Sequence, residues 1–254
     1  MTNRLSELEQ IHAIVVQNPK EVPSDTRKQF WKLVRQIKRD PRPDEQEVIK
    51  ASEIRDSLFE ANRGKTYSLA AGLSLLTLIG LLLLWGYIWA LEIPLLWSGI
   101  LSWNLSNWMT FTLRFLFVFG VIAFFYPLGR AIAGKWAGIK LLGMCRDQYY
   151  EPTLKIDYVT FLKAPAWKRK WFFFFAGFWT FITSFWLWIL GMLLALDFTA
   201  LIPAIFLILF EGGAILSGNP SATRGEMGHY NREKRIERVW KKNLAKLNEV
   251  SDET

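Results

Sequence analysis

The stretch YSLAAGLSLLTLIGLLLLWGYIWAL, residues 67–91, decides the fold class of this chain. It holds no charged side chain, and about 20 consecutive apolar residues are enough for a helix to cross the hydrocarbon core of a membrane. Three further apolar stretches of roughly the required length follow it: Trp108–Pro127, Trp171–Leu193 and Phe198–Ser217. We therefore predict an all-α, polytopic membrane protein with four transmembrane helices.

The distribution of positive charge predicts which way these spans run. Lys and Arg number 13 in residues 1–65, 9 in residues 128–170 and 8 in residues 218–254. The connections 92–107 and 194–197 hold none. Because basic loops stay on the cytoplasmic side, both termini and the long middle loop are expected in the cytoplasm, or in the stroma of a photosynthetic membrane.

The same pattern divides the chain into three parts. Residues 1–65 form a soluble helical head, predicted as three short amphipathic helices with 13 basic and 11 acidic residues. Residues 66–217 form the membrane domain, which includes the cytoplasmic loop 128–170. Residues 218–254 form a basic tail whose helix either lies on an anionic membrane surface or packs against the head. The segment 93–107 is too short to span, and we expect it to be interfacial or re-entrant on the outer side.

Composition excludes several classes of function. The net charge of +8 is what a membrane protein shows when its aqueous segments all face the cytoplasm, and no RNA-binding motif accompanies it, so no nucleic-acid partner is expected. The single Cys145 excludes an internal disulfide and a cysteine-based zinc site. Arg114, inside the second span, is a candidate functional charge by its location, and the alternative is that it snorkels to the outer interface.

A motif stands at the end of the second span: YPLGRAIAGKWAGIK, residues 126–140. It resembles the metal-binding helix of the site-2 protease family of intramembrane metallopeptidases, whose pattern is HExxH followed by small residues and Gly-Ile. Gly129 and Gly138 fit the packing positions of that pattern. The chemical positions differ, since Tyr126 and Arg130 stand in place of the two histidines and Pro127 in place of the catalytic glutamate.

Two further matches support the resemblance. Gly177 in the third span matches a family glycine that follows basic residues and an aromatic, although Phe178 and Phe181 replace the family's proline and asparagine. The fourth span ends in FEGGAIL, residues 210–216, which is similar to the family's LDGGxIL. There Glu211 takes the place of the third metal ligand, and Gly212 and Gly213 match the small residues. The topology predicted from charge brings all three motifs to the cytoplasmic end.

The resemblance implies the fold of this family without its chemistry. Arg130 has no acceptor atom for a metal, so we expect no catalytic residue, no bound metal and no cofactor. An ion pair between Arg130 and Glu211 would instead close the former metal site. The pair Glu226 and His229 has the i, i+3 spacing of a metal motif, but it would need further acidic partners, and a polar pair on the surface of the tail is the alternative.

These observations predict a non-catalytic, site-2-protease-like membrane protein. Such a pseudoprotease would act as an assembly factor, a scaffold or an accessory subunit. Its expected partners are membrane lipid and other membrane proteins, bound through a transmembrane groove or the cytoplasmic head. Two alternatives remain open. One is a membrane enzyme with an unrecognised mechanism, although no nucleophile and base are positioned for it. The other is a small transporter, although few ionisable groups lie in the spans.

Overall fold

A computed structural model describes residues 4–63, 65–95, 97, 103–146, 152–218 and 225–252. The chain divides into two compact units. Unit 1 comprises Met1–Leu69, Ala133–Phe172 and His229–Thr254, and unit 2 comprises Ala70–Ile132 and Phe173–Gly228. Most of the predicted head, middle loop and tail therefore belong to one compact unit rather than to separate regions.

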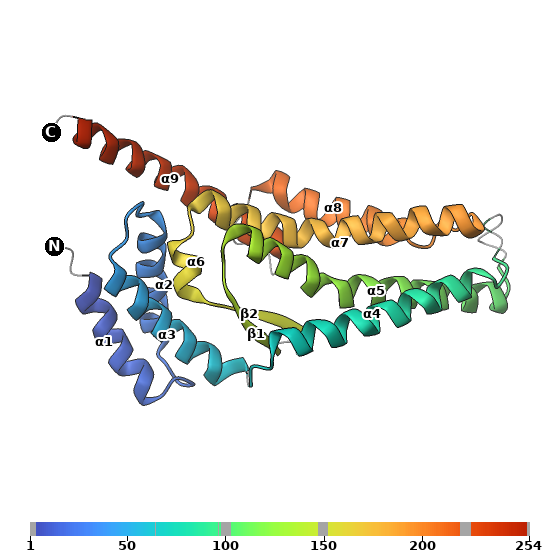
Figure 1. Ribbon diagram of the computed structural model, residues 1–254, viewed down its shortest axis with the longest axis horizontal. Helices are drawn as coiled ribbons and strands as arrows, with labels where there is room; N and C mark the ends of the chain where they lie inside the picture. The colour runs from blue at the N-terminus through green and yellow to red at the C-terminus, as the bar shows by residue number, and fades with distance from the viewer. Residues whose placement is uncertain are drawn as a thin grey trace. The chain divides into compact units, whose positions relative to one another are not determined.

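Unit 1 begins with the three amphipathic helices expected in the head: α1 (Arg4–Gln17), α2 (Ser24–Arg39) and α3 (Glu45–Arg63). Helix α1 packs on α2 and α3, as Figure 1 shows in blue. Each helix buries one apolar stripe. The stripe is Leu8, Ile11 and Val15 on α1, Phe30, Leu33, Val34 and Ile37 on α2, and Val48 and Ile54 on α3. Three short stripes close around one small core, which none of these helices could form alone.

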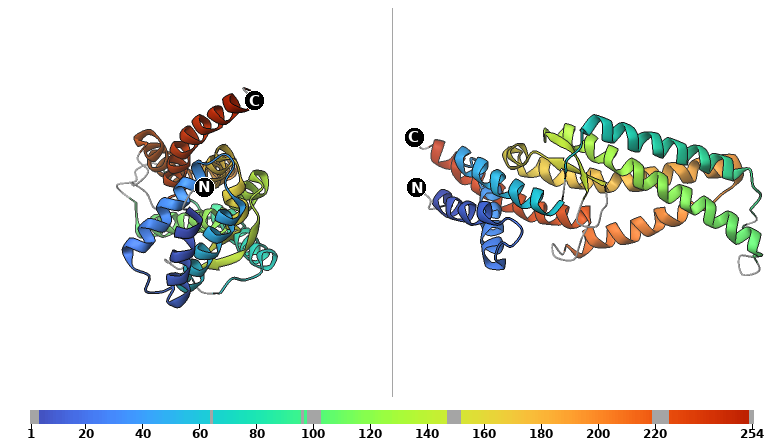
Figure 2. Two further views of the ribbon diagram at one scale, coloured as in Figure 1. Left: turned by 90° about the vertical axis from the view of Figure 1, so that its left-hand side faces the viewer. Right: turned by 90° about the horizontal axis from the view of Figure 1, so that it is seen from below.

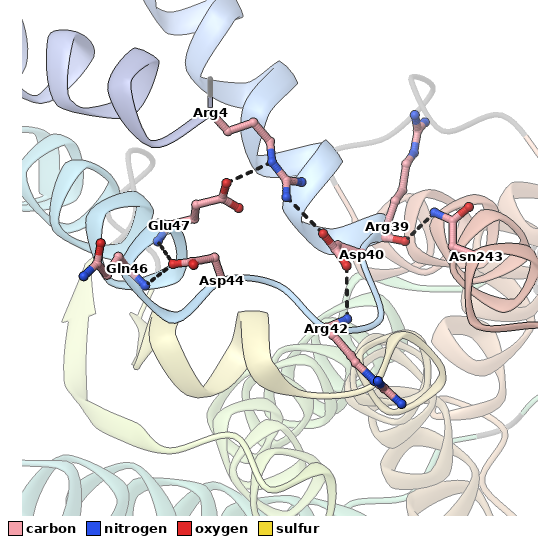
Figure 3. A network of polar contacts seen from close by, with 8 residues as sticks. All are labelled: Arg4, Arg39, Asp40, Arg42, Asp44, Gln46, Glu47 and Asn243. Atoms are coloured by element: carbon pink, nitrogen blue, oxygen red, sulfur yellow. Dashed lines mark hydrogen bonds and ion pairs between the residues drawn. The ribbon is translucent and has the colours of Figure 1, made fainter. Parts of the chain in front are cut away.

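Polar contacts fix the turn between α2 and α3, and Figure 3 shows them from close by. The Asp44 carboxylate accepts hydrogen bonds from the backbone N–H groups of Gln46 and Glu47, so it caps the start of α3. Arg4 of α1 reaches both Asp40, at 3.0 Å, and Glu47, at 3.0 Å. These contacts join the three helices at one end of their bundle.

The middle loop carries structure that the sequence did not predict. Strands β1 (Leu141–Arg146) and β2 (Pro152–Ile156) pair antiparallel, and a short helix α6 (Tyr158–Lys163) follows. The backbone of Tyr67 adds a bridge to Met144, and a Cβ atom at Gly143 would lie 2.4 Å from the Tyr67 oxygen. The fold is therefore predominantly helical, as predicted, with one small sheet in addition.

Helix α9 (Glu226–Asp252) forms the basic tail, and its greater part belongs to unit 1. The Asn243 amide donates to the backbone oxygen of Arg39 at the end of α2, a contact drawn in Figure 3. Lys38 of α2 forms an ion pair with Glu233 of α9 at 2.5 Å. Of the two alternatives for the tail, the structure therefore favours packing against the head.

Unit 2 contains the apolar helices. Helices α4 (Leu69–Leu91), α5 (Leu105–Ala137) and α7 (Ala166–Ala195) are long and apolar enough to cross a membrane. Helix α8 (Leu201–Ser217) is apolar but shorter. Together they indicate an integral membrane protein with three candidate spans. The stretch predicted as a fourth span forms this shorter apolar helix, so the fourth span stays a prediction. The predicted span begins at Phe198, whereas the helix begins at Leu201, because residues 199–200 form a turn before it.

Helices α4, α5 and α7 lie side by side in unit 2, as Figures 1 and 2 show from different directions. Their shared core consists of Tyr87, Leu91, Val118, Val121, Ile122, Leu187 and Ala200. Most of the remaining surface of α4 is exposed leucine and tryptophan, which suits contact with lipid. The segment 93–107 lies partly outside the described residues, so its predicted interfacial or re-entrant path stays a prediction.

Candidate functional site

Two residues of the motif at 126–140 lie together in unit 2. Both are on α5, where Tyr126 and Arg130 stand one helical turn apart. The Tyr126 hydroxyl donates to the carboxylate of Glu226, the first residue of α9. Arg130 lies 3.5 Å from the same carboxylate and 3.5 Å from the Tyr126 hydroxyl. A phenol and a guanidinium thus converge on one carboxylate, and both charged side chains are largely buried.

The position of Glu226 differs from the prediction. The sequence predicts Glu226 as part of a pair with His229, either a metal motif or a polar pair on the surface of the tail. In the structure, the His229 ring lies 2.9 Å from Arg232, is exposed, and belongs to unit 1. No group of three metal-binding side chains occurs among the described residues. A signal for Glu226 existed in the sequence, because it is the only acidic residue between Gly218 and Arg232.

Glu211 of α8 approaches the same region from another side. Its carboxylate interacts with the backbone of Met227 and with the charge of Glu226. A Cβ atom at Gly225 would lie 3.6 Å from the Glu211 Oε1 atom. Arg130 forms an ion pair with Glu226, and the predicted pair between Arg130 and Glu211 stays a prediction. Glu211 thus lies near the first residues of α9.

The glycines of the motif have different roles. A Cβ atom at Gly129 would lie 2.1 Å from the Trp179 ring, and one at Gly177 would lie 2.7 Å from the Met227 methyl group. These two glycines allow close packing, as the motif predicts. Gly138 instead ends α5 in a left-handed conformation, with φ at +75°. Gly212 and Gly213 of α8 have no described atom within 4 Å of an added Cβ.

Pro127 stands at the position of the family's catalytic base, inside α5. It has no side-chain acceptor and no backbone N–H, so it can neither take a proton nor bind a water for attack. Beside it on α5, Tyr126 and Arg130 contact Glu226 and so tie α5 to the start of α9. Chemically, this arrangement neutralises a carboxylate and holds two helices.

Double-mutant cycles decide which acid pairs with Arg130. For Arg130→Met combined with Glu226→Gln, we expect coupling of at least about 1 kcal/mol in the free energy of unfolding, because the two side chains meet in a mostly buried place. For Arg130→Met combined with Glu211→Gln, we expect additivity within about 0.5 kcal/mol. Denaturation in mixed micelles measures both. Coupling only in the Glu211 cycle would show instead that Arg130 pairs with Glu211, as the motif predicts.

A second polar cluster lies in unit 2 around Arg114, whose side chain is 1% exposed. Its guanidinium bonds Asp197 at 2.7 Å and donates to the backbone oxygens of Ala90, Leu91 and Ile93. The last carbonyls of a helix lack hydrogen-bond donors within that helix. At the end of α4, Arg114 donates hydrogen bonds to such carbonyls. Arg114 therefore does not snorkel to the surface. Its charge is buried and paired, which indicates a structural role.

Asp197 is the centre of this cluster and was not predicted as a site residue. It also accepts hydrogen bonds from the hydroxyls of Tyr87 and Thr199, each at 2.9 Å. The side chain of Asp197 is fully buried. Gly191 makes room for the cluster, because a Cβ atom there would lie 2.5 Å from the Tyr87 hydroxyl oxygen. One signal in the sequence could have identified Asp197. It is an acidic residue expected near the outer membrane surface, where Arg114 is also expected.

A third cluster lies within unit 1, where Arg169 is 1% exposed. It bonds Glu233 of α9 at 3.0 Å and the backbone oxygen of Lys38 at 2.7 Å. It also donates to the backbone oxygens of Leu162 and Ala164, just before α7. One arginine thus joins α2, α6, α7 and α9. The sequence had singled out Arg169 only as part of a basic approach to the third span.

Glu233 is the acidic centre of this third cluster and faces two cations. Burial alone would raise its pKa, but the charges of Lys38 and Arg169 outweigh that effect and lower the pKa of the Glu233 carboxyl. Burial lowers the pKa of Lys38, and the neighbouring Arg169 charge acts in the same direction against the attraction of Glu233. The pKa of the Glu233 carboxyl is thus lowered because two opposite charges lie beside it.

No family model matches this chain, and searches of the curated proteins and of the solved structures find no similar protein.

Proposed function

We propose that this chain is a non-catalytic, site-2-protease-like membrane protein that acts as an assembly factor, scaffold or accessory subunit for other membrane proteins. The contact among Tyr126, Arg130 and Glu226 carries the proposal. Zinc-dependent hydrolysis needs several protein ligands and a base that activates the bound water. At the positions where the family has two histidines and a glutamate, this chain has a phenol, a guanidinium and a proline.

The apolar surface of α8 supports a binding role. Its side chains at Leu209, Phe210 and Leu216 are exposed by 70%, 58% and 88%. Gly212 and Gly213 lie between them in sequence, and no atom of the described residues lies within 4 Å of a Cβ added at either. Small residues let the backbone of a second helix come close, and interhelical contacts in membranes are made at such places. A transmembrane segment of a partner is the occupant that this face fits.

The buried charges of unit 2 weigh against transport. A transporter uses intramembrane charges to bind its substrate or coupling ion. Here Arg114 and Asp197 bind each other, two hydroxyls and three backbone carbonyls. Their hydrogen-bonding capacity is largely used within the protein, so a structural role explains them.

Photocrosslinking from native membranes tests the scaffold proposal. A photoreactive residue replaces Leu209 or Leu216 on α8, and Trp85 on α4, which is also 70% exposed, is the matched control. We expect adducts of fixed mass with membrane proteins from α8 and only lipid adducts from Trp85. A Gly213→Leu substitution should abolish the protein adducts, because it fills the close approach. Identical adducts from α4 and α8, or lipid adducts alone, would contradict the proposal.

The proposed orientation has both termini and the middle loop in the cytoplasm or stroma, as the positive-inside pattern indicates. In a Cys145→Ser background, we expect Leu196→Cys to react with an impermeant thiol reagent added outside. Asn248→Cys and Lys140→Cys should react only after permeabilisation. The Leu196 side chain is 69% exposed and takes no part in the Asp197 cluster, so a cysteine there leaves the cluster intact. Labelling of Lys140→Cys from outside would reverse the orientation.

A further inference from the structure

Two tryptophans meet on the surface of unit 1, where α5 ends and α7 begins. The rings of Trp136 and Trp167 lie edge to face, with centroids 5.9 Å apart. The two residues are 47% and 39% exposed. A tryptophan pair could be buried in a core, yet nearly half of this pair faces outwards. Tryptophan prefers the boundary between headgroups and hydrocarbon, where its ring is apolar and its N–H finds a polar partner.

Lysines flank this pair without carboxylate partners among the described residues. They are Lys135 and Lys168, next to the two tryptophans, and Lys140, just beyond the end of α5. The Lys168 ammonium lies 5.7 Å from the Trp167 ring centroid.

Other lysines of unit 1 differ in this respect. Lys155, Lys163 and Lys170 form ion pairs with Glu60, Glu45 and Glu237, at 2.8, 2.5 and 2.6 Å. Lys168 and Lys170 are only two residues apart, yet the first lies against an exposed ring and the second is paired. Positive charge around the tryptophan pair is therefore left for an external anion.

Spacing along α5 agrees with a position at the membrane surface. Trp108, near the start of the helix, is 45% exposed. From Trp108 to Trp136 the helix advances 136 − 108 = 28 residues, or about 42 Å at 1.5 Å per residue. A bilayer including both headgroup layers is about 40–45 Å thick. A straight helix of that number of residues is as long as one bilayer is thick.

We infer that Trp136 and Trp167, with Lys135, Lys168 and Lys140, form a binding site for the headgroup of an anionic phospholipid on the side of the basic loop. The rings would lie at the level of the glycerol backbone, and the ammonium groups would bind the phosphate and its acidic headgroup. Anionic lipids are concentrated in the cytoplasmic leaflet, which is the side predicted for this loop.

Native mass spectrometry of the purified full chain tests this site. The protein, in neutral detergent, receives equimolar dioleoylphosphatidylglycerol and dioleoylphosphatidylcholine, and the retained lipids are counted. We expect the wild type to prefer phosphatidylglycerol. Lys135→Gln with Lys168→Gln should weaken that preference about five-fold for each lysine, because each contributes a comparable electrostatic attraction. Lys135→Arg with Lys168→Arg should keep it, since the charge is unchanged.

Matched variants make the result specific. Lys32→Gln with Arg35→Gln removes two exposed cations of α2 and should leave the preference unchanged. Trp136→Leu with Trp167→Leu should reduce retention of both lipids. An unchanged preference in the Lys135 and Lys168 double variant would overturn the site, as would an equal loss in the α2 control. Displacement of the lipid by millimolar inorganic phosphate would show that the site binds phosphate rather than a lipid. Displacement by a hexaglutamate peptide would show that it binds an acidic protein segment.

Discussion

Replacing Arg114 by methionine is expected to lower the free energy of unfolding by about 3–5 kcal/mol, because it leaves the carboxylate of Asp197 buried without its cation. The side chain of Asp197 is fully buried, so water cannot replace the lost partner. The backbone oxygens of Ala90, Leu91 and Ile93 each lose a hydrogen bond from the guanidinium at the same time. Asp197→Asn should cost a comparable amount, since it leaves the guanidinium without its anion.

A double-mutant cycle separates this pair from general damage to unit 2. Arg114→Met combined with Asp197→Leu should cost clearly less than the sum of Arg114→Met and Asp197→Leu alone, since the double variant leaves neither charge unpaired. Met109→Ala on the same helix is the control, because Met109 is 64% exposed and should change stability little. Unfolding in mixed micelles of increasing dodecyl sulfate content gives the free energies. Strict additivity would mean that the ion pair does not stabilise the protein.

Most of the helices of this fold could be predicted from the sequence, because their signals are local. The stretch 67–91 needs only its length and its lack of charge to be predicted as a span. The head helices needed only the 3.6-residue spacing of apolar residues such as Leu8, Ile11 and Val15. The bounds of α8 were less certain, because Asp197 and Thr199 bond each other and shorten the helix at its start.

The small sheet and the composition of unit 1 could not be predicted in this way. Strands β1 and β2 have six and five residues, and among the described residues they pair with each other and with Tyr67. Such short strands carry too few alternations for a pattern to be distinguished from a loop. The association of α9 with α2 depends on Lys38 and Glu233, which are 195 residues apart in sequence. No local pattern reports a pairing across such a distance.

The candidate site was predicted in part. Tyr126 and Arg130 were identified from the motif, and the structure brings them together on α5. Glu226 was identified as a polar residue, but its position against these two side chains was not, because the motif suggested Glu211 as the acid. A motif gives the residues of a single helix and the order of the helices. It does not show which of two nearby carboxylates reaches an arginine, since that depends on how α9 begins.

The substitution Glu233→Gln is expected to destabilise unit 1 by about 3–5 kcal/mol at neutral pH, because Lys38 and Arg169 would be buried together without an anion. Lys241→Met is the control on the same helix, since the Lys241 side chain is 65% exposed. Hydrogen exchange of α9, measured by mass spectrometry, should show faster opening in Glu233→Gln only. Equal exchange in both variants would mean that the cluster does not hold α9 in place.

The pH dependence of the same variant gives an independent test. The pKa of Glu233 is lowered in the folded protein by two neighbouring cations, against the effect of burial. The carboxyl of an unfolded chain has a pKa of about 4.3, so the stabilisation is fully present above that pH. It is lost as the pH falls from there through the lowered pKa of the folded state.

The difference in stability between the wild type and Glu233→Gln should therefore be constant from neutral pH to about pH 5 and shrink below about pH 4. Denaturant titrations of both proteins at each pH measure this difference, and the other carboxyl groups cancel in it. A difference that is independent of pH down to about pH 2 would show that the effect of Glu233 does not come from its charge.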